Sequence, residues 1–347
     1  MSVGTSGFDC TQTKFNSQTY LRIAGRDIFK VARERGDAVS LISCFQGCSS
    51  LQELPEGIFD GLDIRDASAL LSNVPLQSLP VGLLKDAPNL TNLYGAFYGL
   101  KVEEYPDDMF SDTSKVTSFV TAFRNNTNLK KLPALKGLNA ATTVEGMFYG
   151  CPNLETVPDG YFYTAINILN ADNLFYGCTK LAVSDPEMLK NSTLMTRMIS
   201  GLYQTATANA EVIRMLENKP ALSLFEQFMH STLIVDMPAE YLENIQTAGW
   251  SSVTARNFIS NCPNLRTAVI PENFLYIGSR TFYNLTSCEW IAFKATTPPS
   301  ADVDIISQDV PVVYVPDAAV DTYKAATGFA GYITAGGTIK GISEKPQ

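Results

Sequence analysis

A large apolar residue returns along this chain at a nearly fixed interval. The interval is between 24 and 30 residues, and most steps are 25 to 27 residues long. A period of about 20 to 50 residues indicates an array of stacked structural repeats, which has no single globular core. The residues of this series, which we call the anchor positions, are Phe45, Leu71, Phe97, Phe123, Phe148, Phe175, Leu202, Phe228, Phe258 and Phe282.

Each anchor opens a similar phrase that ends in proline. The phrase FRNNTNLKKLP begins at Phe123, and FYGCPNLETVP begins at Phe148. Proline cannot donate to a β-ladder, so we expect the Leu-x-x-Leu segment before it to be a strand that ends there. The pattern predicts a leucine-rich-repeat solenoid, α/β or mainly β, with about ten repeats of about 26 residues that form one parallel sheet. Whether a helix or a turn follows each proline stays open.

The regions without the repeat are expected to cover the ends of the solenoid, because terminal repeats need caps. We predict a tail and cap over 1–39, with two strands around Gly25, and the solenoid over 40–295. Residues 296–347 are expected to form a cap, made of a strand and a short helix with Asp317 as its N-cap, and a tail. Two irregularities are expected inside the solenoid: a short helix within 205–217, and an insertion near 248–250.

Composition and charge limit the partners. The net charge is −9, from 26 basic and 35 acidic residues. No basic stretch is longer than a pair, which argues against a nucleic acid or an anionic membrane as partner. No apolar run is long enough for direct membrane insertion, and the first residues do not form a secretory signal.

Cysteines follow the repeat. Cys48, Cys151, Cys178 and Cys262 each lie three or four residues after an anchor. Metal ligands and disulfides are the functional alternatives, but the regular placement favours buried structural thiols one coil apart. We predict no metal site and no cofactor.

The phrase from Met147 to Pro158, MFYGCPNLETVP, looks like the BspA-like leucine-rich repeats of bacterial surface proteins. The segment 115–123 is similar to the linking strand of that family, and the prolines at 298–299 with the stretch 312–317 resemble its usual ending. The resemblance implies adhesion or recognition at a bacterial surface, mostly in gut and oral anaerobes. Similar repeats are also familiar from phages that infect such bacteria.

No catalytic constellation is evident in the sequence. The chain has one histidine, His230, which falls where other repeats have a glycine. A nucleophile needs a positioned base and an orienting group, and the sequence offers no such set. Dinucleotide-binding, P-loop and zinc-protease motifs do not occur. We therefore predict a protein that is not an enzyme and has no catalytic residues.

Two rows of side chains are candidate binding surfaces. The first, which we call the strand row, precedes the second leucine of each phrase, and its mixed chemistry suits a protein partner. The second, the aromatic stripe, follows the anchor and could stack on sugars or anchor a protein interface. For each row, a purely structural or solvated role is the alternative. The strand row contains Glu53, Ser78, Glu104, Lys131, Thr156, Val183 and Asp236; the aromatic stripe contains Tyr98, Tyr149, Tyr176, Tyr203 and Tyr283.

The function predicted from these features is non-enzymatic recognition or adhesion, with a protein or glycan bound on one face of the solenoid at a bacterial cell surface or outside the cell. The alternative is a structural or receptor-binding component of a phage virion, in a tail or fibre. In that case, residues 1–18 would attach the chain to an assembly partner.

Overall fold

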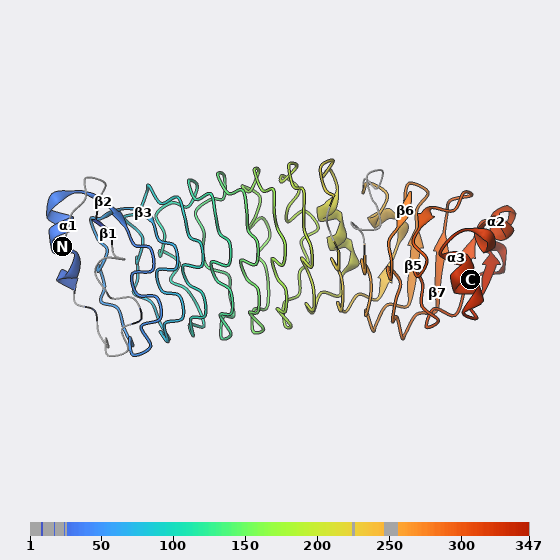
Figure 1. Ribbon diagram of the computed structural model, residues 1–347, viewed down its shortest axis with the longest axis horizontal. Helices are drawn as coiled ribbons and strands as arrows, with labels where there is room; N and C mark the ends of the chain where they lie inside the picture. The colour runs from blue at the N-terminus through green and yellow to red at the C-terminus, as the bar shows by residue number, and fades with distance from the viewer. Residues whose placement is uncertain are drawn as a thin grey trace. The chain divides into compact units, whose positions relative to one another are not determined.

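A computed structural model describes residues 8–9, 17, 24, 26–223, 226–245 and 256–346. The chain packs into two compact units, and each is built from short coils that stack in parallel (Figure 1). Together the units contain about 12 turns of parallel β-solenoid, which confirms the predicted fold class. Unit 1 comprises Met1–Val157 and Tyr161–Leu181, and unit 2 comprises Pro158–Gly160 and Ala182–Gln347.

The anchor phenylalanines form the core of unit 1. The rings of Phe97, Phe123, Phe148 and Phe175 are fully buried. Their centroids lie 5.5, 5.5 and 5.7 Å apart in succession, with planes 8° to 11° from parallel. Such offset stacks contribute beyond simple area burial. Across these four coils the recurring phenylalanine therefore forms a continuous ring stack, one ring per coil, as the period predicts.

A backbone ladder runs beside these rings in unit 1. Alternate N–H groups around each anchor donate to carbonyls of the next coil: Phe97 N to Ala122 O at 2.9 Å, and Gly99 N to Arg124 O at 2.8 Å. The same pattern holds from Leu41 to Gly150, so these N–H groups all point toward the C-terminal neighbour. Left-handed residues recur in the ladder, which explains the glycines and asparagines there; φ is +72° at Gly99, for example.

The strands of unit 1 lie outside the Leu-x-x-Leu segments, where the repeat pattern predicts them. A parallel sheet is formed by β1 (Phe8–Asp9), β2 (Ala38–Ser40) and β3 (Asp63–Asp66), in the order β1-β2-β3. Single bridges continue this line from coil to coil in the segment before each anchor, and at Ser118 they pass through the stretch 115–123 that is similar to the family's linking strand. The bridges join Asp66 to Asn92, Asn92 to Ser118, Ser118 to Thr143, and Thr143 to Asn170. The Leu-x-x-Leu segments contain bridge residues too, at Glu53 and Thr156.

Unit 2 carries the longer sheet. Its parallel strands have the order β10-β9-β7-β5-β4, and here β4 and β5 do coincide with the predicted Leu-x-x-Leu strands. A second pair, β6 (Tyr276–Ile277) and β8 (Ser300–Ala301), lies apart from this sheet. The prediction of one sheet is therefore wrong, because the described strands form three. The five strands are β4 (Asp236–Met237), β5 (Thr267–Ile270), β7 (Trp290–Phe293), β9 (Val313–Val315) and β10 (Ile339–Gly341).

Two short helices lie between β1 and β2, where strand structure was expected. They are the 3-10 helix η2 (Arg26–Phe29) and α1 (Lys30–Arg35), so the strand prediction over 26–31 is wrong. Helix α1 ends at Gly36, whose left-handed backbone lets its N–H reach the carbonyls of the last turn. Two further predictions fall outside the described residues: the assembly segment over 1–18, apart from β1 and Ser17, and the insertion near 248–250.

The helix expected within 205–217 is present in unit 2. It is η3 (Ala210–Leu216), a 3-10 helix capped by the Asn209 side chain, which accepts from Glu211 N. Another 3-10 turn, η4 (Ala239–Tyr241), follows β4 after its terminal proline.

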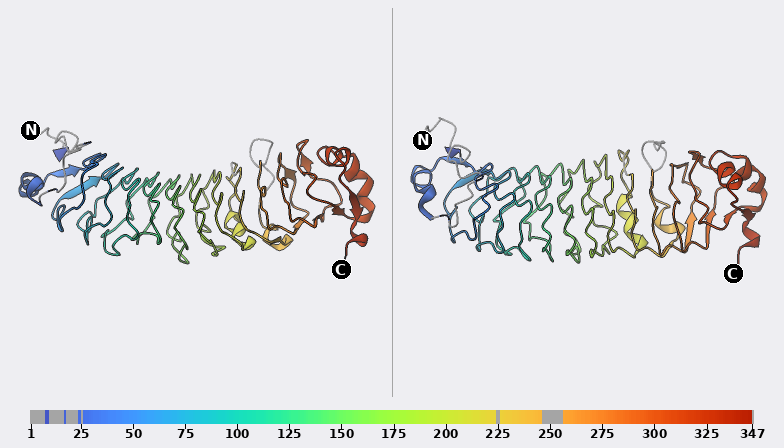
Figure 2. Two further views of the ribbon diagram at one scale, coloured as in Figure 1. Left: turned by 90° about the horizontal axis from the view of Figure 1, so that it is seen from below. Right: turned by 60° about the horizontal axis from the view of Figure 1, so that its bottom comes forward.

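The C-terminal segment contains more structure than predicted. After β9 come η5 (Asp317–Ala319), α2 (Val320–Ala325) and α3 (Phe329–Thr334), at the C-terminal end of unit 2 (Figure 2). Asp317 is not the N-cap. It lies inside η5, and its carboxylate accepts from Ser343 N and Oγ at 3.1 and 2.8 Å. The predicted tail contains β10, which pairs with β9, and η6 (Ile342–Glu344).

The cysteines within the described residues are free and buried. Cys151 and Cys178 donate their Sγ–H to the carbonyls of Phe123 and Phe148, at 3.2 and 3.0 Å. Burial raises the pKa of the Cys178 thiol, which keeps it protonated and unreactive. The prediction of structural thiols is confirmed for these residues.

Candidate functional site

The strand row is exposed at all but one of its predicted positions. In unit 1 the exposed members are Glu53, Ser78, Glu104, Lys131 and Thr156. In unit 2 Asp236 is exposed, whereas Val183 is buried and so does not belong to the surface.

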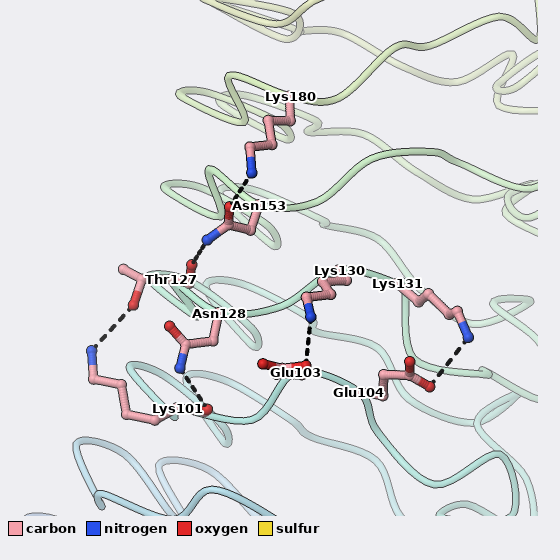
Figure 3. Close-up of polar contacts among 9 residues, drawn as sticks. All are labelled: Lys101, Glu103, Glu104, Thr127, Asn128, Lys130, Lys131, Asn153 and Lys180. Atoms are coloured by element: carbon pink, nitrogen blue, oxygen red, sulfur yellow. Dashed lines mark hydrogen bonds and ion pairs between the residues drawn. The ribbon is translucent and has the colours of Figure 1, made fainter.

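Ion pairs join neighbouring coils along this row (Figure 3). Lys131 Nζ lies 3.2 Å from a Glu104 carboxylate oxygen, and beside it Lys130 Nζ lies 2.6 Å from Glu103. The hydrogen bond to Glu103 raises the pKa of the Lys130 ammonium. Exposed pairs such as these contribute little to stability, but they fix where the charges stand on the surface.

Amide and hydroxyl side chains make a second set of links between coils, next to the ion pairs (Figure 3). Lys101 Nζ donates to Thr127 Oγ1 at 3.3 Å, and Lys180 Nζ donates to Asn153 Oδ1 at 2.7 Å. Asn128 and Asn153 donate to the carbonyls of Lys101 and Thr127, at 3.0 and 2.7 Å. The face is thus held in place from coil to coil by side chains as well as by the backbone.

The aromatic stripe is half-buried in unit 1, and two of its rings pack on each other. Tyr149 and Tyr176 stack at 4.6 Å between centroids, with planes 1° apart. The Arg124 guanidinium lies 4.0 Å from the Tyr149 ring centre and takes the stripe position in its own coil. This packing favours the structural alternative for Tyr149 and Tyr176.

Tyr98 is different from these two. In the described part of the chain no ring or cation stacks on it, and its hydroxyl accepts a hydrogen bond from Asn125 Nδ2 at 2.9 Å. The preceding coil has the small residue Ser72 at the stripe position. A ring that lacks a neighbour on one side is open to a ligand.

The stripe in unit 2 includes the histidine. Leu202 N donates to Phe228 O, and Met229 N donates to Phe258 O. In unit 1 an anchor N–H donates to the residue just before the next anchor. Met229 and Ile259 therefore hold the anchor positions, and the predicted anchors Phe228 and Phe258 are each one residue early. His230 therefore stands in the tyrosine position and not in the glycine position.

The surroundings of His230 are those of a packed ring. Tyr203 stacks on it at 4.5 Å, with planes 7° apart. Its Nδ1 lies 2.8 Å from Ser231 Oγ, and its Nε2 lies 2.5 Å from Asn261 Nδ2. Burial lowers the pKa of the imidazole, and only 9% of the residue is exposed. With one face covered and both nitrogens bonded, the ring has the contacts of a structural residue.

The last predicted tyrosine, Tyr283, is exposed, with the Arg280 guanidinium 5.5 Å from its ring centre. Among the described residues, no group of three or more His, Cys, Asp and Glu side chains could hold a metal ion. Nor does any helix in the described ranges have the length and apolarity needed to cross a bilayer.

Sequence reasoning missed the polar residues around Tyr98. Asn73 and Asn125 have left-handed backbone, with φ of +57° and +58°, in the position that glycine holds in neighbouring repeats. An asparagine that replaces a repeat glycine keeps the backbone conformation and adds an amide to the surface. Asparagine in place of the repeat glycine was therefore the sequence signal that could have located these residues.

A family model identifies the type of repeat in part of the chain. Residues 241–300 match the family model described as "BspA type Leucine rich repeat region", with 6 copies. A comparison with curated protein sequences found no match.

Solved structures of leucine-rich-repeat proteins are also similar. One is a leucine-rich repeat protein from Bacteroides ovatus, with 16% identity, coverage of 93% of this chain and 88% of that chain, and a TM-score of 0.41. A leucine rich cell surface protein from Faecalibacterium prausnitzii has 12% identity, coverage of 88% and 78%, and a TM-score of 0.25. An internalin from Listeria monocytogenes has 10% identity, coverage of 90% and 85%, and a TM-score of 0.24.

With TM-scores this low, the identification rests on the repeats and on the family match. The phrase read from the sequence, the ring stack that it builds and the matched model describe the same unit. The chain resembles the BspA-like leucine-rich-repeat proteins, and residues 241–300 match their repeat model.

Proposed function

We propose that this chain is a non-enzymatic recognition and adhesion protein, which holds a protein or glycan partner on the strand row of unit 1 at a bacterial cell surface or outside the cell. Leucine-rich-repeat proteins generally bind other proteins. The charges on the side chains of the strand row support the proposal that this row is the contact surface.

One observation carries the proposal: the row presents charges of both signs in fixed places. Glu104 and Lys131 are exposed on adjacent coils, and an ion pair of 3.2 Å joins their side chains. Paired charges at a coil spacing of about 4.8 Å offer a partner a complementary pattern and set its orientation. A surface that is already ordered loses less entropy when it binds.

The test exchanges the two charges and keeps the pair. In the double variant Glu104→Lys with Lys131→Glu, the ion pair can form again, so the fold is preserved while the pattern is reversed. Labelled wild-type chain is first tested on epithelial cells, bacterial cells and immobilised extracellular glycoproteins. On the surfaces that bind it, we expect the exchange to reduce binding at least tenfold, about 1.4 kcal/mol.

The matched control exchanges the ion pair of Lys30 and Glu34 in α1, which lies outside the row and is exposed to a similar extent. Its binding should stay at the wild-type level. The proposal is wrong if the wild-type chain binds none of these surfaces, or if the row exchange has no more effect than the control. The virion alternative stays a prediction, because its attachment segment lies almost wholly outside the described residues.

A further inference from the structure

A hollow lined by both polar and apolar groups lies beside Tyr98 in unit 1. Its volume is about 440 Å³, and the residues that line it come from three consecutive coils. No carboxylate lines it, although the chain as a whole carries a net charge of −9. The principal lining residues are Asn73, Pro75, Tyr98, Lys101, Asn125 and Thr127.

The ring of Tyr98 is available in this hollow. Asn125 Nδ2 holds the hydroxyl oxygen at 2.9 Å, so the ring is fixed in place, while the hydroxyl donates to no atom of the described residues. Tyr149, in contrast, is covered by Arg124 and Tyr176. Tyrosine offers an apolar face with a polar edge, which suits a ligand that has both kinds of surface.

Glycines on the following coils let the two amides lie flat against the surface. A Cβ at Gly99 would be 2.9 Å from Asn73 Oδ1, and a Cβ at Gly150 would collide with Asn125 Oδ1. Each amide supplies donors and an acceptor, as ligand hydroxyl groups require. The amides therefore stand on either side of the ring in defined positions.

Lys101 adds a charge that is not neutralised. Its ammonium donates to the Thr127 hydroxyl at 3.3 Å, and no carboxylate of the described residues pairs with it. Lys130 and Lys131, farther along the same face, are both paired (Figure 3). An unpaired lysine beside a ring and neutral amides favours a ligand that carries its own negative group.

We infer that this hollow binds an oligosaccharide that contains an acidic sugar. The apolar face of a sugar ring stacks on Tyr98, Asn73 and Asn125 bond its hydroxyl groups, and Lys101 binds its carboxylate or sulfate. The inference rests on the proposed recognition role and names the class of one ligand. A second hollow adjoins across Pro75 and is lined by Ser49, Ser50, Gln52 and Gln77, whose neutral hydroxyls and amides suit further sugar units.

The experiment is a glycan array with neutral and acidic oligosaccharides, followed by calorimetric titration of the strongest binder against the full chain. We expect acidic oligosaccharides to bind. The Tyr98→Ala variant should bind them at least about tenfold more weakly than the wild type. Lys101→Gln should also lower the affinity for acidic oligosaccharides. It should reduce the dependence of binding on salt as well, since it removes the attraction between the Lys101 ammonium and the acidic group of the ligand, which salt screens. The matched control, Tyr149→Ala, changes the same stripe outside the hollow and should keep the affinity within about twofold.

Three results would overturn the inference: no saccharide on the array binds, only uncharged saccharides bind, or Tyr98→Ala binds as tightly as Tyr149→Ala. Thermal melting of each variant checks that a loss is not caused by unfolding. If no saccharide binds while the strand-row exchange still reduces adhesion, the saccharide site inferred for the hollow is wrong, but the proposed recognition role is supported.

Discussion

Tyr149 is held between two residues of adjacent coils, Arg124 before it and Tyr176 after it. The ring centroids of the tyrosines are 4.6 Å apart, and the guanidinium carbon lies 4.0 Å from the Tyr149 centroid. Contacts of this kind tie one coil to the next at the surface, in parallel with the phenylalanine stack inside.

Tyr149→Ala should therefore cost stability. An aromatic pair and a cation–π contact are each worth about 0.5–1.5 kcal/mol, so we expect the free energy of unfolding to fall by about 1–2 kcal/mol. Urea denaturation followed by circular dichroism measures this. Tyr98 has no stacking partner among the described residues, so Tyr98→Ala should lower the free energy of unfolding by less. Equal losses in the two variants would contradict the structural role of the stack.

Phe123→Ala should have a much larger effect. The ring is fully buried between Phe97 and Phe148, 5.5 Å from each. Replacing a buried phenylalanine by alanine typically costs about 3–5 kcal/mol, because a cavity remains. Phe123→Leu fills most of that volume and serves as the comparison. A loss below about 1 kcal/mol for the alanine variant would show that the ring stack does not hold the coils together.

His230 should make unit 2 sensitive to mild acid. Burial lowers the pKa of the imidazole below its usual value of about 6.5, so the unfolded chain binds the proton more readily than the folded chain. The stability contributed by the neutral ring is complete above about pH 6.5 and is lost as the pH falls through the folded pKa. Melting temperatures between about pH 7 and 5 should show this decline. His230→Tyr, which restores the usual stripe residue, should remove it.

Lys219 should be a source of instability at neutral pH. The residue is 2% exposed, and its Nζ donates to the carbonyls of Glu217 and Lys190, at 3.2 and 3.4 Å. Burial lowers its pKa to about 8, below the value of about 10.4 in an unfolded chain. Stability should therefore rise with pH between about 8 and 10.4.

Lys219→Met removes the buried charge and should raise the free energy of unfolding at pH 7 by about 1–3 kcal/mol. Lys85→Met, at an exposed lysine, is the control. A methionine variant less stable than the wild type would show that the two carbonyl contacts outweigh the cost of burying the ammonium.

The core of the fold could be predicted because an aromatic ring at a fixed interval must be buried somewhere in every repeat, and stacking is the simple solution. The repeat pattern alone did not predict the position of the strands in unit 1, which only the resemblance of 115–123 to the family's linking strand indicated. The bridges pass through Asp66, Asn92, Ser118, Thr143 and Asn170, which are polar and show no alternation of apolar residues. In unit 2 the repeat pattern aligns Phe228 and Phe258 with the anchors, whereas the backbone hydrogen bonds place Met229 and Ile259 there.

The candidate site was predictable only in part. Charged residues such as Glu104 and Lys131 were expected on the surface because a charge is rarely buried. That Tyr98 is open while Tyr149 is covered depends on the residue that stands in the same place one coil away. For Tyr98 that residue is Ser72, and this pairing follows from the register of the coils and not from the local sequence.

The one-way ladder of unit 1 has a consequence for how such a chain can change in length. Every coil from Leu41 to Gly150 offers acceptors to the coil before it and donors to the coil after it. A duplicated or deleted set of about 26 residues would therefore find complementary neighbours on both sides. An insertion of a few residues within the ladder would instead misalign its donors. Recombination between repeats can thus alter how many partner-facing side chains the protein displays without redesigning either terminus.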